Sequence, residues 1–213
     1  MKLLVATRSS GKMREIRRIL ASLPSFHVLS LKDLGIEYNP EEEGLEPFET
    51  FAENALSKAK YFYSLSGLLT VADDSGISVD ALAGAPGVRS KRFAGDGGTA
   101  PLNLGGSALD DANNRHLIAS LRGVPERGRT ARYVCLAALV GDGDARPVFF
   151  RGEAPGLIVD TPAGSGGFGY DPHVFCEEIG RTYAQMNPKE KDTRSHRGAA
   201  FRELAQHLAK KAE

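Results

Sequence analysis

The stretch Leu69-Thr70-Val71-Ala72-Asp73-Asp74-Ser75-Gly76 joins a short apolar run to two adjacent carboxylates, a hydroxyl and a glycine. Its apolar half, residues 69–72, is too short for a helix and predicts a buried strand, while residues 73–76 predict a turn. Ligands collect beyond the carboxyl ends of strands in open α/β sheets, so this turn is a candidate site for chemistry. The alternative is a polar turn in which one aspartate caps a helix or closes an Asx turn.

The composition is that of an ordinary globular protein. The 213 residues fit one large domain or two lobes that share a core, and 41% of them are hydrophobic. Lys+Arg and Asp+Glu both number 27, and this balance argues against a general binder of nucleic acid or of membrane surfaces. The two cysteines have no metal-ligand spacing, and no apolar run is long enough for a signal peptide or a membrane span. We therefore expect an intracellular protein in which Cys135 is a buried thiol.

The N-terminal residues predict a strand, a loop and a helix in succession. Residues 2–6, Lys2 followed by four apolar residues, predict the strand, and the stretch Thr7-Arg8-Ser9-Ser10-Gly11-Lys12 follows them. The helix is indicated by helical spacing of Met13, Ile16, Leu20 and Leu23, with Ser9 or Ser10 as its N-cap. A helix N-terminus beside a lysine favours phosphate binding, although a capped helix with an exposed Lys12 has the same pattern. A P-loop is excluded because Ala6 stands where its first glycine is required and Met13 follows the lysine.

An acidic loop precedes a second helix. Glu41, Glu42, Glu43, Glu46 and Glu49 crowd one short segment, which is either a solvated charge run or a source of metal ligands. Since Mg²⁺ prefers one or two carboxylates with waters and phosphate oxygens, a loop glutamate could join Asp73 or Asp74 around it. Residues 50–53 form a capping box, and the helix after it carries an apolar face of Phe51, Ala55, Ala59 and Phe62.

The middle of the chain predicts a mixed sheet. Residues 77–82 fit a strand or the start of a short helix, and residues 95–111 read as a loop before a helix at 112–121. Strands are expected at 131–140 and 146–152, joined by a turn at 141–144 as an antiparallel hairpin. The cations Arg89, Lys91 and Arg92 either reach phosphates or are solvated.

Two further stretches suggest ligand binding. Residues 164–172 are dense in glycine, which indicates positive φ or close backbone approach, and Phe168 and Tyr170 offer faces for stacking a base. A plain structural loop is the alternative. Residues 189–198 open a helix with an apolar face of Ala200, Leu204 and Leu208. Ser195, His196 and Arg197 are expected near its start with their donors outward, either to bind a ligand or as surface residues.

Together these motifs resemble the inosine/xanthosine triphosphate pyrophosphatase family, over nearly the whole chain. The resemblance is carried by residues 7–15, 51–55, 72–76, 84–88, 166–172 and 195–198. It implies an α/β fold in which residues 1–213 form one domain, an elongated two-lobed structure with a long central mixed sheet flanked by helices. It also implies a nucleotide in the cleft between the lobes, a requirement for Mg²⁺, and a cytoplasmic homodimer.

The resemblance also assigns roles to individual residues. Asp74 matches the catalytic carboxylate and a metal ligand, with Asp73 beside it. Glu42 matches the second metal ligand, and Glu43 or Glu46 are alternatives because the acidic loop is longer than usual. The triphosphate would be held by Thr7, Arg8, Ser9, Ser10, Gly11 and Lys12. Ser75 would touch the substrate, and the nucleoside positions match Phe168, Gly169, Tyr170, Asp171, Lys191, His196 and Arg197.

The implied reaction converts a purine nucleoside triphosphate and water into the monophosphate and pyrophosphate. Selection would use donors from Arg197 or the backbone that bond a 6-oxo group and are left unpaired by a 6-amino group. Two departures from the family pattern are Ser9 in place of Asn and Gln185 in place of Glu. The alternatives are a non-catalytic purine nucleotide sensor and a diphosphatase for modified pyrimidine or methylated nucleotides.

Overall fold

The structure, a computed structural model, describes residues 1–101, 104–141, 143 and 146–211. The chain forms two compact units. Unit 1 comprises Met1–Asp74, Cys135–Gly152 and Ser195–Glu213, and unit 2 comprises Ser75–Val134 and Glu153–Arg194. Among the described residues, no helix has the length and apolar character needed to cross a membrane.

The strands form one mixed sheet in the order β2-β1-β3-β4-β5-β6-β7. Strand β1 pairs in parallel with β2 and β3, whereas β5 with β6 and β6 with β7 pair antiparallel. The mixed sheet expected from the sequence is therefore confirmed. The strands are β1 Lys2–Val5, β2 His27–Ser30, β3 Leu69–Val79, β4 Thr130–Val140, β5 Val148–Ile158, β6 Val174–Cys176 and β7 Arg181–Thr182.

Six α-helices and seven 3₁₀ helices lie among the described residues. The α-helices are α1 Ser10–Leu20, α2 Phe51–Ser66, α3 Phe93–Asp96, α4 Gly106–Ser120, α5 Pro188–Arg194 and α6 His196–Lys211. The 3₁₀ helices are η1 Lys32–Leu34, η2 Pro40–Leu45, η3 Asp80–Leu82, η4 Gly87–Arg92, η5 Glu126–Gly128, η6 Asp171–His173 and η7 Tyr183–Gln185.

The turn expected at residues 73–76 is wrong, because β3 runs straight through them to Val79. Gly76 marks a close backbone approach instead of a turn. A Cβ on Gly76 would lie 2.3 Å from the Gly87 carbonyl oxygen and 2.4 Å from Ser90 Oγ. The Ile77 amide donates to that same Ser90 hydroxyl at 2.9 Å. Residues 77–82 then continue as the end of β3 followed by η3.

Two other boundaries differ from expectation. Helix α4 begins at Gly106, so residues 106–111, expected to be loop, are helical, and α3 takes residues 93–96. The structure gives a long-range reason, since Asp110 accepts a hydrogen bond from the Gly169 amide. Strand β5 runs from Val148 to Ile158 in place of 146–152. Of the expected loop and turn, residues 102–103, 142 and 144 lie outside the described residues.

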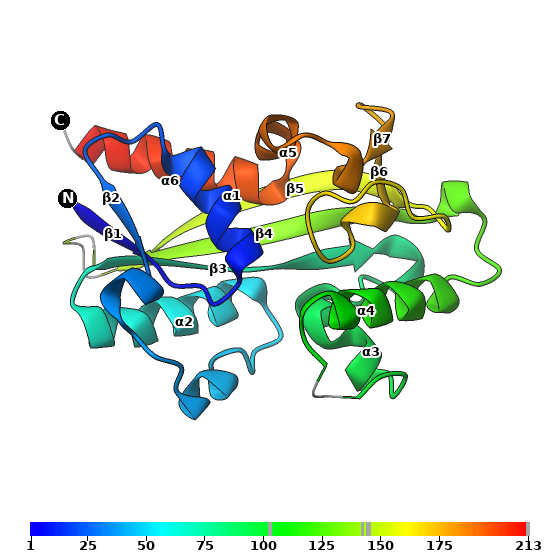
Figure 1. Cartoon of the computed structure of the whole chain (residues 1–213), viewed down its shortest axis with the longest axis horizontal. Helices are drawn as coiled ribbons and strands as arrows, with labels where there is room; N and C mark the ends of the chain where they lie inside the picture. The colour runs from blue at the N-terminus through cyan, green and yellow to red at the C-terminus, as the bar shows by residue number, and fades with distance from the viewer. Residues whose placement is uncertain (102–103, 142, 144–145, 212–213) are drawn as a thin grey trace. The chain divides into compact units, whose positions relative to one another are not determined.

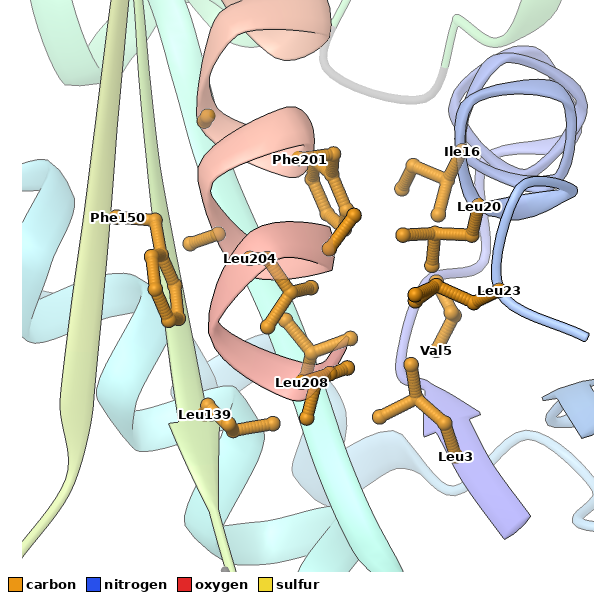
Figure 2. Packing of buried hydrophobic residues seen from close by; sticks show 14 of the residues in the cluster. Leu3, Val5, Ile16, Leu20, Leu23, Leu139, Phe150, Phe201, Leu204 and Leu208 are labelled. Atoms are coloured by element: carbon orange, nitrogen blue, oxygen red, sulfur yellow. The ribbon is translucent and has the colours of Figure 1, made fainter. Parts of the chain in front are cut away.

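The core of unit 1 has two layers, one on each face of its strands. On one face Leu3, Val5 and Val71 pack with α1 and α6, and on the other Leu4, Ala6 and Ala72 pack with α2. Figure 1 shows α1 and α6 on one side of these strands and α2 on the other. Figure 2 shows Phe201 of α6 pointing toward Ile16 of α1, two residues that are fully buried. The apolar faces expected for α1 and α6 are thereby confirmed, including Ala200, Leu204 and Leu208 at 0% exposure. In α2 the expected Ala55, Ala59 and Phe62 are buried, whereas Phe51 is only partly buried.

Unit 2 has its own core. The end of β3, the helix α4 and the strands β4, β5 and β6 contribute to it, together with the segment after Gly169. Its buried members are Ile77, Val79, Leu117, Leu121, Ala131, Tyr133, Ala154, Ile158, Tyr170, Val174, Cys176, Tyr183 and Met186. A chain that folds into two such units presents two separate sets of candidate site residues.

Candidate active site

Asp73 and Asp74 lie in the middle of β3, at the end of the part of this strand that belongs to unit 1. Successive side chains of a strand point to opposite faces. Asp73 therefore shares its face with Val71, toward α1 and α6, and Asp74 shares its face with Ala72, toward α2. The two carboxylates have different partners, and their mutual repulsion is not what defines the site.

Asp73 is 2% exposed and is surrounded by cations. Its Oδ2 lies 3.0 Å from Lys12 Nζ and 3.3 Å from Arg197 Nε, and the Cys135 thiol lies 3.8 Å away. Burial alone would raise the pKa of Asp73, but the charges of Lys12, Arg197 and Lys58 outweigh it and hold this pKa well below its usual range. Asp73 is thus an ionised anchor for the cations around it.

Asp74 is 7% exposed and faces helix α2. Its Oδ2 accepts a hydrogen bond of 3.1 Å from Asn54 Nδ2, and its Oδ1 lies 3.9 Å from Lys58 Nζ. Burial raises the pKa of Asp74. The charges of Lys58 and Lys12 lower this pKa and the charge of Glu46 raises it, and the net shift is upward. A carboxylate whose pKa is raised by burial is better suited to accept a proton than Asp73.

Lys58 links the acidic loop to β3. Its ammonium group pairs with Glu46 and donates to the Asp73 carbonyl oxygen at 2.7 Å. Burial would lower the pKa of Lys58, but the charges of Glu46, Asp74 and Asp73 raise it. Asn54 fixes the same loop, because its side chain donates to the Phe48 carbonyl and accepts from the Phe48 amide.

Sequence reasoning missed both Asn54 and Lys58 as site residues. One signal was available, because residues four apart in a helix lie on one face. The spacing of Thr50, Asn54 and Lys58 places polar groups next to the apolar face of α2. Thr50 is the N-cap of α2, as expected, and its hydroxyl accepts from the Glu53 amide.

The three glutamates considered as metal ligands have different surroundings. Glu42 receives two hydrogen bonds from Arg8, at 2.6 and 2.9 Å, and one from the Asn39 amide, and the Arg8 bond is the largest cause of its lowered pKa. Glu43 accepts from Tyr38 at 2.8 Å. Only Glu46, of these three, shares a cation with Asp74.

The donor set around Asp74 fits a divalent cation. Glu46 raises the pKa of Asp74, so the two carboxylates interact electrostatically, while the charges of Lys58 and Lys12 lower that pKa. Nowhere in the described ranges do three His, Cys, Asp or Glu side chains gather as a metal-binding group. Two carboxylates are nevertheless what Mg²⁺ typically takes from a protein, with water and phosphate oxygens completing its shell.

The N-terminal loop directs its two cations differently. Ser9 is the N-cap of α1, accepting from the Lys12 amide at 3.3 Å, and Lys12 extends to Asp73. Thr7 accepts from the Ser9 amide at 3.2 Å, which shapes the loop. Arg8 turns to Glu42 of the acidic loop and also donates to the carbonyls of residues 36 and 37, which precede this loop. The structure thus brings Lys12, but not Arg8, to the carboxylates of β3.

His196 and Arg197 are buried, so the expectation that they point outward at the surface is wrong. Arg197 is 2% exposed, and its Nη1 donates to Glu15 at 2.6 Å while Nε donates to Asp73. Glu15 is a buried carboxylate that sequence reasoning did not single out. Its position on α1 gives no local sign of its partner, which lies 182 residues further along the chain.

Five of the seven predicted nucleoside-binding residues, Phe168 to Asp171 and Lys191, lie in unit 2, where Asp171 organises them, whereas His196 and Arg197 belong to unit 1. Asp171 accepts from the Phe168 amide at 2.9 Å, from Tyr133 Oη at 3.1 Å and from Lys191 Nζ at 2.5 Å. The Lys191 ammonium lies 4.9 Å from the centre of the Phe168 ring. Tyr170 is not a stacking surface, because it is 6% exposed in the core and donates to the Ser90 carbonyl. Phe168 is only partly buried and remains the candidate for stacking.

The remaining predicted residues are distributed over both units. Ser75 follows Asp74 in β3 and is the first residue of unit 2. Ser10 and Gly11 begin α1. Gln185 accepts from the Thr182 amide at 3.0 Å and closes a capping box at η7. Arg89 and Arg92 both pair with Asp96. Cys135 and Cys176 are both buried free thiols.

Comparison with known proteins covers almost the entire chain. A dITP/XTP pyrophosphatase from Geobacter sulfurreducens is 45% identical over 207 residues, which are 97% of this chain and 96% of that protein. The solved structure of a HAM1 protein from Coxiella burnetii superposes with a TM-score of 0.81 at 30% identity, over 99% of both chains. A nucleoside-triphosphatase, dITP/XTP pyrophosphatase, from Mycobacterium abscessus gives a TM-score of 0.67 at 40% identity, over 98% of this chain and 99% of that one. The model of the Ham1 family matches residues 3–207, and the chain belongs to this family.

Proposed function

We propose that this protein hydrolyses the non-canonical purine nucleoside triphosphates ITP, dITP and XTP to the monophosphate and pyrophosphate. The observation that carries the proposal is the cluster on β3, where a buried carboxylate of raised pKa lies between Asn54 and a lysine that also holds Glu46. Relatives over nearly the full chain length are dITP/XTP pyrophosphatases, which supports the substrate class.

Asp74 is the proposed general base. Its raised pKa and its place beside Asn54 suit a carboxylate that orients and deprotonates the attacking water. Asp74 and Glu46 are the proposed protein ligands of Mg²⁺, because Glu42 is engaged by Arg8 and Asn39. When bound, the metal ion neutralises charge on the phosphate oxygens. Lys58 holds both carboxylates in position for it.

Lys12 and the start of α1 are the proposed phosphate contacts. The N-terminus of a helix favours anions, and Lys12 adds a full positive charge there. Asp73, kept ionised by its surroundings, fixes where the Lys12 ammonium points. Asp73 thus positions a cation and does not exchange a proton in this proposal. Arg197 and Glu15 fix Asp73 in turn.

Residues of unit 2 are the proposed purine-binding group. The Phe168 ring offers a face for stacking, and Lys191, held by Asp171, lies beside it. A donor beside the Phe168 ring, such as the Lys191 ammonium, can bond a 6-oxo group, because the amides of Phe168 and Gly169 already donate to carboxylates and Arg197 is buried against Glu15 and Asp73. A 6-amino group leaves such donors unpaired, so ATP is expected to be a poor substrate.

The test is a substrate panel in Mg²⁺ with pyrophosphate and orthophosphate assayed separately. ITP, dITP and XTP should release pyrophosphate much faster than ATP does. Orthophosphate as the direct product would refute the proposed cleavage position. Tight binding of ITP without turnover would identify a sensor, and preferred turnover of modified pyrimidine or methylated nucleotides would replace the proposed substrate class.

A further inference from the structure

Gly169 is held by two side chains of helix α4. Its amide donates to Asp110 Oδ2 at 2.8 Å, and its carbonyl accepts from Asn114 Nδ2 at 3.0 Å. Asp110 and Asn114 are four residues apart, so they lie on one face of the helix. Both polar groups of one glycine backbone are therefore bound by one helix in unit 2.

The residue before Gly169 is also held. The Phe168 amide donates to Asp171 Oδ2 at 2.9 Å. Three side-chain hydrogen bonds thus fix the backbone on both sides of the Phe168 ring. Gly169 has φ of 65°, in the left-handed region, and a glycine free to leave that conformation would lose the most entropy on being ordered. The bonds from α4 remove this freedom before any ligand arrives.

Asn113 provides a built-in comparison. It is 3% exposed, accepts from the Ala94 amide at 2.8 Å and donates to the Lys91 carbonyl at 3.0 Å. Two adjacent asparagines of α4 therefore form side-chain hydrogen bonds with the backbone of two different segments. Asn113 holds residues 91–94, whereas Asn114 holds the segment that carries Phe168.

We propose that Asp110 and Asn114 are positioning residues for the purine base, acting through Gly169 on the Phe168 ring. This inference rests on the proposed role of Phe168 in binding the base. A loop ordered in its binding conformation avoids the cost of ordering when the ligand binds. The loop contacts the base and not the reacting phosphates, so it contributes equally to ground-state and transition-state binding. Loss of this clamp, the hydrogen bonds of Asp110 and Asn114 with the Gly169 backbone, should raise KM and leave kcat nearly unchanged.

The experiment uses the full-length protein in Mg²⁺ and two phosphate-containing probes, of which only one carries a purine base. Isothermal titration calorimetry measures Kd for inosine monophosphate and for inorganic pyrophosphate. Asp110→Ala and Asn114→Ala should each raise the Kd for inosine monophosphate about ten-fold, which is the effect of one lost hydrogen bond to a site group. The Kd for pyrophosphate should stay within about two-fold of its value in the unaltered protein. In ITP turnover the KM should rise similarly while kcat stays within about two-fold.

Matched variants separate the inference from general damage. Asp110→Asn keeps an oxygen that can accept from the Gly169 amide and should restore most of the affinity. Asn113→Ala removes an equally buried asparagine and should leave inosine monophosphate binding unchanged. If an alanine variant fails to fold, Gly169→Ala perturbs the backbone conformation that Asp110 and Asn114 hold and should also weaken the binding of inosine monophosphate, because its Cβ meets nothing within 4 Å and only the positive φ is disfavoured.

The outcomes distinguish the two levels of the proposal. If Phe168→Ala weakens inosine monophosphate but folded Asp110 and Asn114 variants do not, the clamp has no positioning role. The inference also fails if Asn113→Ala is as damaging as Asn114→Ala. If Phe168→Ala itself leaves inosine monophosphate binding unchanged, the base does not bind at this segment and both the proposed base site and the clamp are refuted.

Discussion

Asp73 and Asp74 are consecutive residues whose side chains lie on opposite faces of strand β3. Asp73 contacts Lys12 of α1 and Arg197 of α6, whereas Asp74 accepts a hydrogen bond from Asn54 of α2. The same chemical group thus acquires opposite properties, since the pKa of Asp73 is held below its usual range and that of Asp74 is raised. This difference supports the proposed roles of Asp73 as an anchor for cations and of Asp74 as the proton acceptor.

Replacing Asp74 by Asn should abolish most turnover without unfolding the protein. The amide cannot accept a proton, and loss of a general base typically lowers kcat by roughly 10²–10⁴-fold. An oxygen remains to accept from Asn54, so the fold should persist. Pyrophosphate release from ITP and far-UV circular dichroism measure the two effects, and turnover equal to that of the unaltered protein would reject the role of Asp74.

The pH dependence of kcat/KM should respond to the charge on Lys58. Activity falls as pH falls through the pKa of Asp74, because the protonated carboxyl is no longer a base. Lys58 lowers this pKa, so Lys58→Met should move the acid limb to higher pH. Lys60→Met, an exposed lysine of the same helix, is the control. An acid limb that stays in place in Lys58→Met, or moves equally in both variants, contradicts the assignment.

Metal affinity should distinguish Glu46 from Glu42. Glu46→Gln removes a proposed ligand and should weaken Mg²⁺ binding in calorimetry by at least about ten-fold, the range seen when groups at metal sites are altered. Glu42→Gln makes the same change of charge in the same loop but breaks the pairing with Arg8. It should lower the midpoint of thermal unfolding while Mg²⁺ affinity changes by less than about two-fold. The reverse pattern would identify Glu42, and not Glu46, as the Mg²⁺ ligand.

The parts of this site that were predictable from sequence are those set by local patterns. Ser9 and Thr50 cap their helices because their hydroxyls lie within reach of an amide three residues on. The apolar spacing of α1 and α6 correctly identified the residues that pack together in unit 1. The Ham1 family was recognised on the same basis, from short motifs in a fixed order.

What could not be predicted depends on contacts between distant residues. Arg197 reads as a surface residue near a helix start, and only its partners Glu15 and Asp73, both far away in sequence, explain its burial. Residues 73–76 have the composition of a turn, yet Gly76 serves a close approach of Gly87 and Ser90. The sequence around Asp110 predicts a loop, because nothing in the neighbouring residues indicates its hydrogen bond with Gly169.

Asp73 should contribute to stability as well as to the site, with a definite dependence on pH. Its pKa is depressed in the folded protein, so its stabilisation is present above the unfolded-state value of about 4 and is lost as pH falls through the folded-state pKa. Asp73→Asn leaves Lys12 without its buried partner and takes one of two carboxylates from Arg197. At pH 7 this should cost about 3–5 kcal/mol of unfolding free energy in urea titrations.

The control for Asp73 is an ion pair with similar groups at the surface. Asp80 pairs with Arg132 at 3.2 Å, and both side chains are about half exposed (50% and 46%). Asp80→Asn should change the unfolding free energy by less than about 1 kcal/mol, because water and salt screen the pair. The destabilisation by Asp73→Asn should also shrink as the pH is lowered below about 4, because the stabilisation that the ionised aspartate gives the folded state is lost there. Equal effects of the two substitutions, or a loss that grows at low pH, would show that burial among cations does not stabilise Asp73.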